Sequence, residues 1–372
     1  MGAAMIEGGA KRMQVVSVGH FPPPVHGCSY ITRCMTDLIA KNYSVREVVI
    51  NAPVGVVGLR KHFIRFARAL YAVCIIFKSR GFIRTCYISG EGSFGLIYNV
   101  MVAFAAVLVG ATPYIHHHNY NYIDHYNPIM LILNRVMVRG VHIFLSEQMR
   151  HDFQSRYGVI NKGCVISNAA FVPPVEFGFD DEEDSENSLV VGFLSNLTRE
   201  KGLYLFLDLL RAAAARGESI RGILAGPVAL EEDRVAIVRA KDELGGRLDY
   251  RGPIYGDDKS KFYNDIGIFV FPTNYTNEAQ PTVIFEALAA GCQVVSYDRG
   301  CIATQVKDDG LVIPRDRDFV AAAMDWLVLA NRSRSVRGGI ITRYAARHAR
   351  ARGVIHGLFG PASHECLSSC AD

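Results

Sequence analysis

Short apolar segments rich in β-branched residues alternate with helical patterns along most of the chain. In the first half, the segments that predict strands are 13–20, 45–51, 85–89, 113–118, 141–146 and 164–168. Helical patterns lie between them, and this alternation is typical of parallel sheets built from βαβ units. Because the strands are nearly continuous apolar runs, we expect both faces of the sheet to be buried.

An acidic stretch interrupts the alternation. Residues 173–188 begin with two prolines, hold six acids between Asp180 and Glu186, and show no periodicity, which predicts an exposed linker. The alternation then restarts, with strands expected at 189–195, 222–226, 248–252, 267–273, 293–298 and 310–314. We therefore expect two Rossmann-like domains, an N-terminal one at 1–172 and a C-terminal one at 189–331, which face a central cleft at their strand ends. A basic helix or tail at 332–372 would follow and could cross back to the N-terminal domain.

Composition favours a soluble globular protein in a reducing compartment. The chain has 372 residues, of which 50% are hydrophobic and 20% charged. Its net charge of +4 is too small to indicate nucleic-acid binding. Nine scattered cysteines fit free thiols, and no apolar run reaches the roughly 20 residues of a membrane span. We also expect no signal peptide, and hence a cytoplasmic protein.

Two loops that follow predicted strands favour an anionic ligand. In the first, GHFPPPVHGCS at 19–29, a helix opens near Gly27, and its unpaired N–H groups could meet an anion; an ordinary connecting loop is equally compatible. In the second, GFLSNLTREKG at 192–202, Lys201 stands where a helix begins. A cation is disfavoured there by the helix dipole, which a phosphate would explain, although Lys201 could also be a plain surface residue.

A third segment, NEAQPTVIFEALAAG at 277–291, sets Glu278 in the loop after a buried strand and Glu286 in an apolar helix. A carboxylate in such a helix is costly without hydrogen-bond donors, and the ribose hydroxyls of a nucleotide would supply them. Alternatively, Glu286 could cap the helix or pair with a nearby arginine.

This segment resembles the E-x7-E signature of retaining nucleotide-sugar glycosyltransferases of family 4, which have the GT-B fold. The similarity runs roughly from Met13 to Asn331, since GHFPPPVHG, LSEQMRHDFQSRYG with VISNAAF, and LSNLTREKG also resemble segments of that family. The resemblance implies that Glu286 holds ribose, that Glu278 faces the donor sugar, and that Lys201 neutralises the leaving diphosphate without a metal ion. The donor-binding residues that it implies are Gly27, Ser195, Asn196, Arg199, Lys201, Glu278, Ala279, Gln280, Pro281, Thr282 and Glu286.

The sequence departs from the family pattern at two places. The family commonly has an arginine shortly before the lysine, where this chain has Ser195 and Asn196, and Arg199 could substitute for it. The family's G-G-x-P-E segment is replaced by RGCIAT at 299–304. No Asp-x-Asp pair occurs in the expected donor loop, so we expect no metal cofactor.

Acceptor-side residues are expected in the N-terminal domain. His118 and Asn119 end the histidine run HHHNYNYID at 116–124 and resemble the family's histidine near the donor sugar and acceptor, which would make His118 catalytic. Because side chains alternate along a strand, the three consecutive histidines should not share one metal ion. Tyr120 and Tyr122 could stack on a sugar, and Glu91 in GEGSFG could bind acceptor hydroxyls or simply be a solvated loop residue.

Two basic segments could contact anionic lipid. Residues 59–84 contain no acid; Lys61, Arg65 and Arg68 share one helical face, whereas Ile64, Ala67, Tyr71 and Cys74 share another. This pattern indicates a membrane-surface helix, or a core helix with a basic edge. The arginine-rich tail after Trp326 is either a solvated helix or a contact for phosphate or lipid.

Together these features predict a retaining glycosyltransferase that moves a sugar from a nucleoside-diphosphate sugar to a hydroxyl of a glycan or lipid-linked glycan, as in surface polysaccharide biosynthesis. The protein would be cytoplasmic, with an anionic membrane surface as a candidate partner. The alternatives are a nucleotide-sugar epimerase of the same fold, which the paired glutamates disfavour, and an inactive sugar-nucleotide-binding protein, which Lys201 disfavours.

Overall fold

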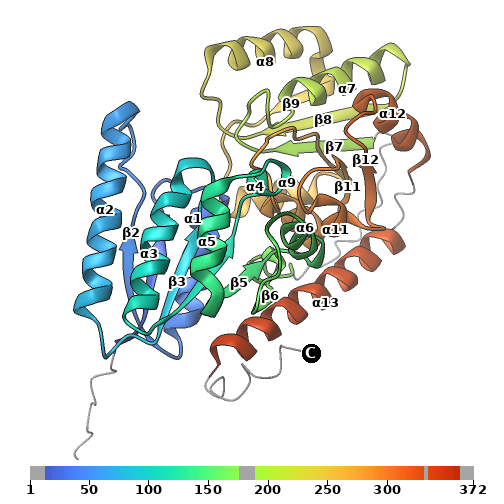
Figure 1. The fold of residues 1–372 in the computed structure, drawn as a ribbon. Helices are drawn as coiled ribbons and strands as arrows, with labels where there is room; N and C mark the ends of the chain where they lie inside the picture. The colour runs from blue at the N-terminus through green and yellow to red at the C-terminus, as the bar shows by residue number, and fades with distance from the viewer. Residues whose placement is uncertain (1–12, 176–188, 331–333, 361–372) are drawn as a thin grey trace, which may run out of the picture. The chain divides into compact units, whose positions relative to one another are not determined.

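The structure is a computed structural model that describes residues 13–175, 189–330 and 334–360 (Figure 1). It divides into two units. The first runs to Val165 and takes in the segment that starts at Val354, and the second is Ile166–Gly353. Each unit holds one six-stranded sheet. Most of the predicted acidic linker, from residue 176 to residue 188, lies outside the described residues.

The first sheet is parallel throughout and has the strand order β2-β1-β3-β4-β5-β6. Its strands are β1 (Met13–Gly19), β2 (Ser44–Val49), β3 (Thr85–Gly90), β4 (Thr112–His117), β5 (Val141–Phe144) and β6 (Gly163–Val165). All six predicted strands are confirmed, with small shifts at their ends. Val16, Ile88, Ile115 and Ile143 are fully buried, as expected for a sheet covered on both faces.

Helices follow the strands of the first sheet in turn. They are α1 (Gly27–Ala40), α2 (Gly58–Lys78), α3 (Leu96–Leu108), α4 (Asn121–Asp124), α5 (Pro128–Val136) and α6 (Glu147–Tyr157). The crossover from β1 to β2 runs opposite to the later ones, so right-handed connections place α1 on one face and α2, α3 and α5 on the other. Figure 1 shows α2, α3 and α5 side by side, and α3 packs against both of its neighbours.

The second sheet repeats this architecture with the strand order β12-β11-β10-β7-β8-β9, again parallel. Its strands are β7 (Leu189–Leu194), β8 (Ile220–Ala225), β9 (Leu248–Tyr250), β10 (Ile268–Phe271), β11 (Gln293–Tyr297) and β12 (Gly310–Ile313). The helices are α7 (Leu203–Ala215), α8 (Glu231–Leu244), α9 (Asp257–Asn264), α10 (Thr282–Ala289), α11 (Ile302–Val306), α12 (Phe319–Leu329) and α13 (Arg334–Phe359). The second set of strand predictions is therefore also confirmed.

Each sheet has one point where the order of strand addition reverses. In the first sheet this point lies between β1 and β3, and in the second it lies between β7 and β10. Loops that leave two such strands diverge to opposite faces and open a crevice beyond the carboxyl ends, where ligands of open α/β sheets bind. A ligand-binding site is thus expected at the loops after β1, β3, β7 and β10.

Helix α13 accounts for several arginines of the basic tail. Arg343 and Arg347 both contact the buried carboxylate of Asp309, and Arg337 donates to the carbonyl of Ala290 over 3.0 Å. These side chains have partners within the second unit, although that of Arg343 is still 50% exposed to solvent. The helix ends in the first unit, where the carbonyl of Phe359 accepts a hydrogen bond from Asn42.

Helix α2 presents only part of the predicted basic face to solvent, because Lys61 is exposed whereas Arg65 and Arg68 are turned inward. Arg65 is buried and donates to Glu91, and Arg68 donates to the carbonyl of Asn51. Tyr71 and Cys74, on the apolar face, are exposed instead. The side chains that α2 buries are Arg65, Ala69, Ala72, Ile75 and Ile76, and Arg65 pairs there with the buried carboxylate of Glu91.

Candidate functional site

The loop after β7 is held tightly against the loop after β10. Gly202 has φ +100°, and a Cβ atom there would lie 2.4 Å from the carbonyl oxygen of Pro272, so only glycine fits. The amide of Asn274 donates to the carbonyl of Glu200 over 2.8 Å. These contacts set residues 195–202 beside residues 272–281 at the switch point of the second sheet.

Lys201 and Glu278 meet at this switch point. The Nζ of Lys201 lies 2.5 Å from the Oε2 of Glu278, which also accepts a hydrogen bond from Thr273 over 3.4 Å. The lysine ammonium lies 4.3 Å from the centre of the Tyr275 ring. Helix α7 begins at Leu203, so Lys201 stands just before the helix rather than in its first turn. The structure thus brings together the two charged residues that the sequence singled out separately.

Arg299 supports the loop that carries Glu278, and sequence reasoning did not identify it as a site residue. Its guanidinium is buried and donates to the carbonyls of Tyr275, over 3.1 Å, and Thr276. A Cβ atom at Gly300, where φ is +57°, would lie 2.5 Å from the carbonyl oxygen of Glu278. The replacement of the family's G-G-x-P-E by RGCIAT was the available signal, since it introduces this arginine.

Residues 279–281 also use their polar groups to hold this loop. The Oε1 of Gln280 accepts from the amide of Asn168 over 2.7 Å, and the carbonyl of Ala279 accepts from the amide of Cys301 over 2.7 Å. The carbonyl of Pro281 accepts from Gln305, and Thr282 begins α10. The donor-binding role of residues 279–282 stays a prediction, and the hydrogen bonds described above position the segment between Glu278 and Glu286.

Glu286 has protein donors as partners. Its Oε2 lies 2.6 Å from the Nζ of Lys259 and accepts a hydrogen bond from Tyr263 over 2.9 Å. Burial first and the Glu286 carboxylate second raise the pKa of Tyr263 well above its ordinary value, so the phenol stays a donor. Glu286 therefore does not depend on a ribose for its hydrogen-bond donors. Lys259 and Tyr263, both on α9, were missed because nothing in their local sequence links them to Glu286.

Three predicted donor-binding residues precede Lys201 in the same loop, and two of them are exposed. Arg199 extends over the ring of Tyr204, with 3.8 Å between its guanidinium carbon and the ring centre, and Asn196 is also exposed. Ser195 is half-buried, and a Cβ atom at Gly226 would lie only 1.7 Å from the Ser195 carbonyl oxygen. In this structure Arg199 is thus a partner of Tyr204, which gives no support to its role as a substitute for the family's arginine.

The first sheet has an ionic cluster at its own switch point. His20 follows β1, and its Nε2 lies 3.3 Å from the Oε1 of Glu91, which follows β3. The Glu91 carboxylate also forms an ion pair with Arg65. Burial by itself raises the pKa of the Glu91 carboxyl, but His20 and Arg65 outweigh this and lower it. Glu91 is therefore an anchored carboxylate rather than the solvated loop residue that was the alternative.

The segment after β4 is largely engaged within the first unit. The ring of His118 lies 4.1 Å from that of His116, and burial, followed by the proximity of His20 and His26, lowers the pKa of His118 to about 3. Asn119 accepts from the amide of Asn121 over 2.8 Å, and Tyr120 donates to Asp152 over 2.5 Å.

Tyr120 and Tyr122 are 5% and 2% exposed. They are therefore not an open stacking platform, which corrects the interpretation that they could stack on a sugar. Gly27 lies at the first turn of α1 with His26 as its N-cap, in a different unit from the other donor candidates. A Cβ atom at Gly27 would meet nothing within 4 Å, so close packing does not require a glycine there.

The histidine run splits between two faces, as strand geometry requires. His117 contacts His142 over 3.0 Å, on the side opposite to His116 and His118. Among the described residues, no group of three His, Cys, Asp or Glu side chains is placed to hold a metal ion. No helix within the described ranges is both long and apolar enough to cross a membrane.

The repeated parallel sheet, with a cation and a carboxylate at the second switch point, defines a class: this is the GT-B fold. Anabaena HepE in complex with UDP has a TM-score of 0.67 and 16% identity, covering 96% of this chain and 100% of that one. The sucrose-phosphate synthase of Thermosynechococcus elongatus has a TM-score of 0.69 and 14% identity, over 93% and 98%. The lipopolysaccharide outer core galactosyltransferase WaaB, in its apo form, has a TM-score of 0.63 and 12% identity, over 92% and 99%.

Residues 188–329 match the family model described as Glycosyl transferases group 1. This match covers all six strands of the second sheet and includes Lys201, Glu278 and Glu286. No curated protein matches the chain in sequence. The second unit thus contains a region that matches the group 1 glycosyltransferase family, and the two sheets together have the GT-B fold.

Proposed function

We propose that the protein is a retaining glycosyltransferase that moves a sugar from a nucleoside diphosphate to a hydroxyl of a glycan or lipid-linked glycan. The observation that carries this proposal is the pair of Lys201 and Glu278 at the β7–β10 switch point. The ammonium would stabilise the negative charge that develops on the departing diphosphate, and the carboxylate beside it would face the sugar. No step of this scheme requires a metal ion.

Glu286 would hold the ribose of the donor. Its side chain is 21% exposed, and Lys259 and Tyr263 fix its Oε2, so the carboxylate is oriented before a nucleotide arrives. Pre-orientation of this kind lowers the entropic cost of binding. Crystal structures of HepE hold UDP, UDP with glucose, or UDP-glucose, so UDP is the first probe for this chain.

The first unit would bind the acceptor. Glu91, His118, Asn119 and Tyr120 lie after β3 and β4 at the carboxyl edge of the first sheet. Glu91 is already paired with Arg65 and His20. We therefore propose that the ionic cluster of these three side chains, rather than Glu91 alone, contacts acceptor hydroxyls. A surface glycan or its lipid-linked precursor is the proposed acceptor, at the cytoplasmic side of a membrane.

The test is a thermal-shift screen against nucleotide sugars, followed by transfer assays in which the anomeric configuration of the product is read by NMR. Ligand binding raises the apparent stability of the folded chain. We expect stabilisation by one nucleotide sugar and a product that keeps the donor's configuration. An inverted product would refute retention. A released, epimerised donor would favour the epimerase, and binding without turnover would favour an inactive protein.

A further inference from the structure

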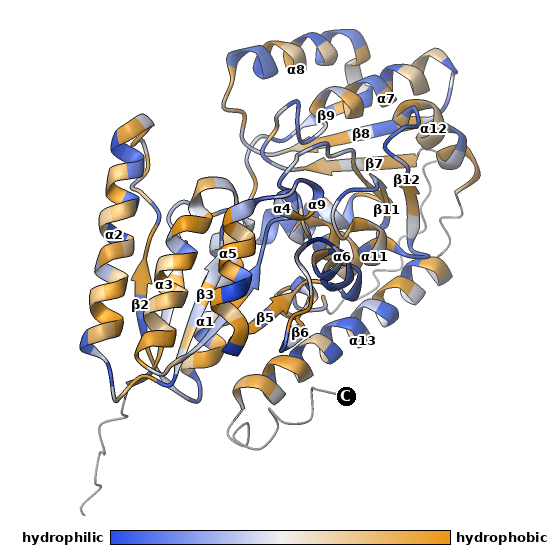
Figure 2. Cartoon of the chain, in the orientation of Figure 1, coloured by the Kyte–Doolittle hydropathy of each residue, from blue (hydrophilic) through white to orange (hydrophobic). Residues whose placement is uncertain are grey.

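Helix α2 exposes an apolar stripe along its length. Its members recur at three, four or seven residues, so they lie on one face, and they are Leu59, 89% exposed, Phe63, 72%, Phe66, 44%, Leu70, 43%, and Phe77, 41%. Figure 2 shows that the helix is apolar over much of its length. Scattered exposed apolar residues are ordinary, but a continuous stripe of large apolar side chains marks a surface that interacts with a protein, a membrane or a ligand.

The neighbouring helix α3 extends this surface. Its residues Leu96–Leu108 include no charged side chain, and those that face outward are Ile97, Phe104 and Leu108, which are 42%, 52% and 58% exposed. Helices α2 and α3 pack against each other on the same face of the sheet (Figure 1). We call the outward side of these two helices the α2–α3 face.

The charged side chains of α2 and of the segment just after it are all basic. Arg60, Lys61 and Lys78 on α2, with Arg80 and Arg84 just after it, are exposed, and no acid occurs between Glu47 and Glu91. Apolar side chains bordered by cations are the pattern of helices that lie in the interface of an anionic bilayer. The cations would sit at the headgroups while the aromatic rings enter the acyl boundary.

We propose that the α2–α3 face is a membrane-docking surface that inserts its apolar side chains into an anionic lipid bilayer. The face departs from the basic face that the sequence suggested, because Arg65 and Arg68 are turned inward and the aromatic residues point outward. The proposal deepens the proposed function. It rests on that function only in one respect, namely that a lipid-linked acceptor would give the enzyme a reason to dock on a membrane. A second copy of the chain is a poorer occupant, because a symmetric contact would bring the cationic borders together.

Flotation of the full chain with vesicles tests the proposal. The vesicles are phosphatidylcholine alone, or phosphatidylcholine mixed with phosphatidylglycerol. We expect flotation with the anionic vesicles, and we expect it to weaken with salt without vanishing at about 1 M, because inserted apolar side chains are not screened. The double variant Phe63→Ser, Phe66→Ser should bind at least about tenfold more weakly, since each ring loses apolar burial.

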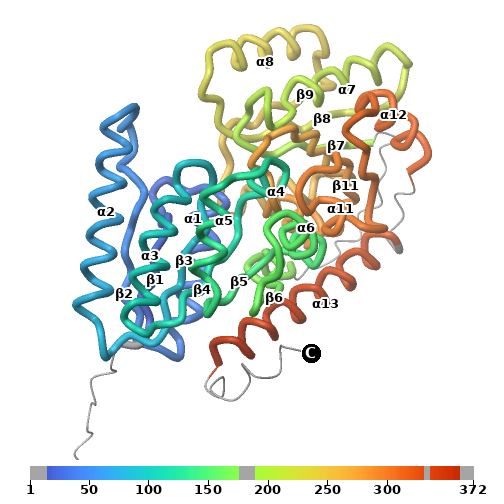
Figure 3. Tube along the Cα trace, in the orientation of Figure 1, coloured from blue at the N-terminus to red at the C-terminus, as the bar shows by residue number. Residues whose placement is uncertain are grey.

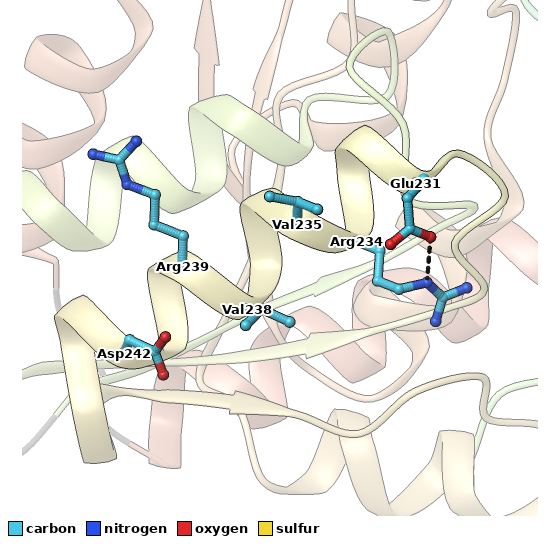
Figure 4. A pocket seen from close by; sticks show the side chains of 6 residues that line it. All are labelled: Glu231, Arg234, Val235, Val238, Arg239 and Asp242. Atoms are coloured by element: carbon cyan, nitrogen blue, oxygen red, sulfur yellow. Dashed lines mark hydrogen bonds and ion pairs between the residues drawn. The ribbon is translucent and has the colours of Figure 1, made fainter.

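Two further variants separate charge from insertion. Arg60→Glu with Lys78→Glu should weaken binding to anionic vesicles by at least about fivefold for each reversed charge. The matched control is Val235→Ser with Val238→Ser, on the outer face of α8. Figure 4 shows these two valines among Glu231, Arg234, Arg239 and Asp242. They are 57% and 55% exposed but have mixed charges around them, so this variant should float like the wild type.

The results of these measurements distinguish a lipid bilayer from a second copy of the chain as the occupant of the α2–α3 face. A chain that ignores anionic vesicles at every salt concentration, or phenylalanine variants that float like the wild type, would overturn the proposal. So would a dimer, seen by analytical ultracentrifugation, that the phenylalanine variants abolish while vesicles have no effect. UDP binding is measured in parallel by thermal shift. A wild type that binds UDP but does not float with anionic vesicles refutes the docking surface alone, whereas a wild type that no nucleotide or nucleotide sugar stabilises refutes the proposed function.

Discussion

The ammonium of Lys201 and the carboxylate of Glu278 lie 2.5 Å apart although 77 residues separate them in the chain. They meet because β7 and β10 are neighbours in the sheet and the loops after them are joined by the Asn274–Glu200 hydrogen bond. The side chains are 21% and 11% exposed, so the pair is partly shielded from solvent. A diphosphate that reached Lys201 would share the ammonium with Glu278, which holds the cation in place without saturating it.

Replacement of Lys201 by alanine should lower kcat by about 100-fold or more, because a fixed cation that meets charge on the leaving group acts in the transition state. Steady-state kinetics with the matched control Lys261→Ala, an exposed α9 lysine with a 73% exposed side chain, measures the effect. The Tm of Lys201→Ala, measured beside its kinetics, separates the loss of catalysis from the instability of an unpaired Glu278. A raised acceptor KM with unchanged kcat would contradict the assigned role.

Glu286→Ala should weaken donor binding by about 1–3 kcal/mol if its carboxylate holds the ribose by charged hydrogen bonds. Lys259→Ala is the natural comparison, since it removes the partner of Glu286 and leaves the carboxylate. Calorimetric Kd values for the nucleotide and Tm values are measured for both variants. If both lower Tm equally and neither changes donor affinity, Glu286 is only the partner of Lys259.

Gly202→Ala should destabilise the second unit and displace Lys201. The left-handed backbone alone costs about 1–3 kcal/mol for a residue with a Cβ atom, and the contact with Pro272 adds to this. Gly217→Ala is the control, because Gly217 has φ +73° but an added Cβ atom meets nothing within 4 Å. Urea denaturation should therefore show the larger loss for Gly202→Ala, and only this variant should also lose nucleotide affinity. Equal losses would mean that the close packing at Gly202 is unimportant.

The first unit should lose stability as the pH falls below neutral. Burial lowers the pKa of His118 and His142 to about 3, and those of His116 and His117 lie well below their ordinary values. Between about pH 3 and about pH 6.5 the unfolded chain therefore binds protons that the folded chain does not. The free energy of unfolding should fall with decreasing pH in this window, by up to about 1.4 kcal/mol per pH unit for each histidine.

Hydrogen exchange of peptides from the first unit, compared between pH 7 and pH 5, measures this dependence after correction for intrinsic exchange rates. The variant His118→Asn removes one of the histidines and should reduce the slope. A free energy of unfolding that is constant over this range would show that the buried histidines are not neutral in the folded state as their surroundings require.

Features carried by neighbouring residues could be predicted from the sequence. The strands were located because β-rich apolar runs are local, and the two-sheet fold follows from their alternation with helices. Lys201 and Glu278 were identified one at a time, each by its place after a strand. The pair that they form could not be read from either segment, since it depends on which strands become neighbours.

Contacts between distant segments were decided only by the tertiary structure. Lys259 as the partner of Glu286, and Arg299 as the support of residues 275–276, join parts of the chain that share no pattern. The orientation of α2 shows the same limit. Its sequence defines a basic face and an apolar face, but the folded helix divides both: Lys61, Tyr71 and Cys74 are exposed, whereas Arg65 is buried and meets Glu91, which follows β3. Periodicity determines which side chains share a face, whereas burial and pairing in the folded chain determine what that face meets.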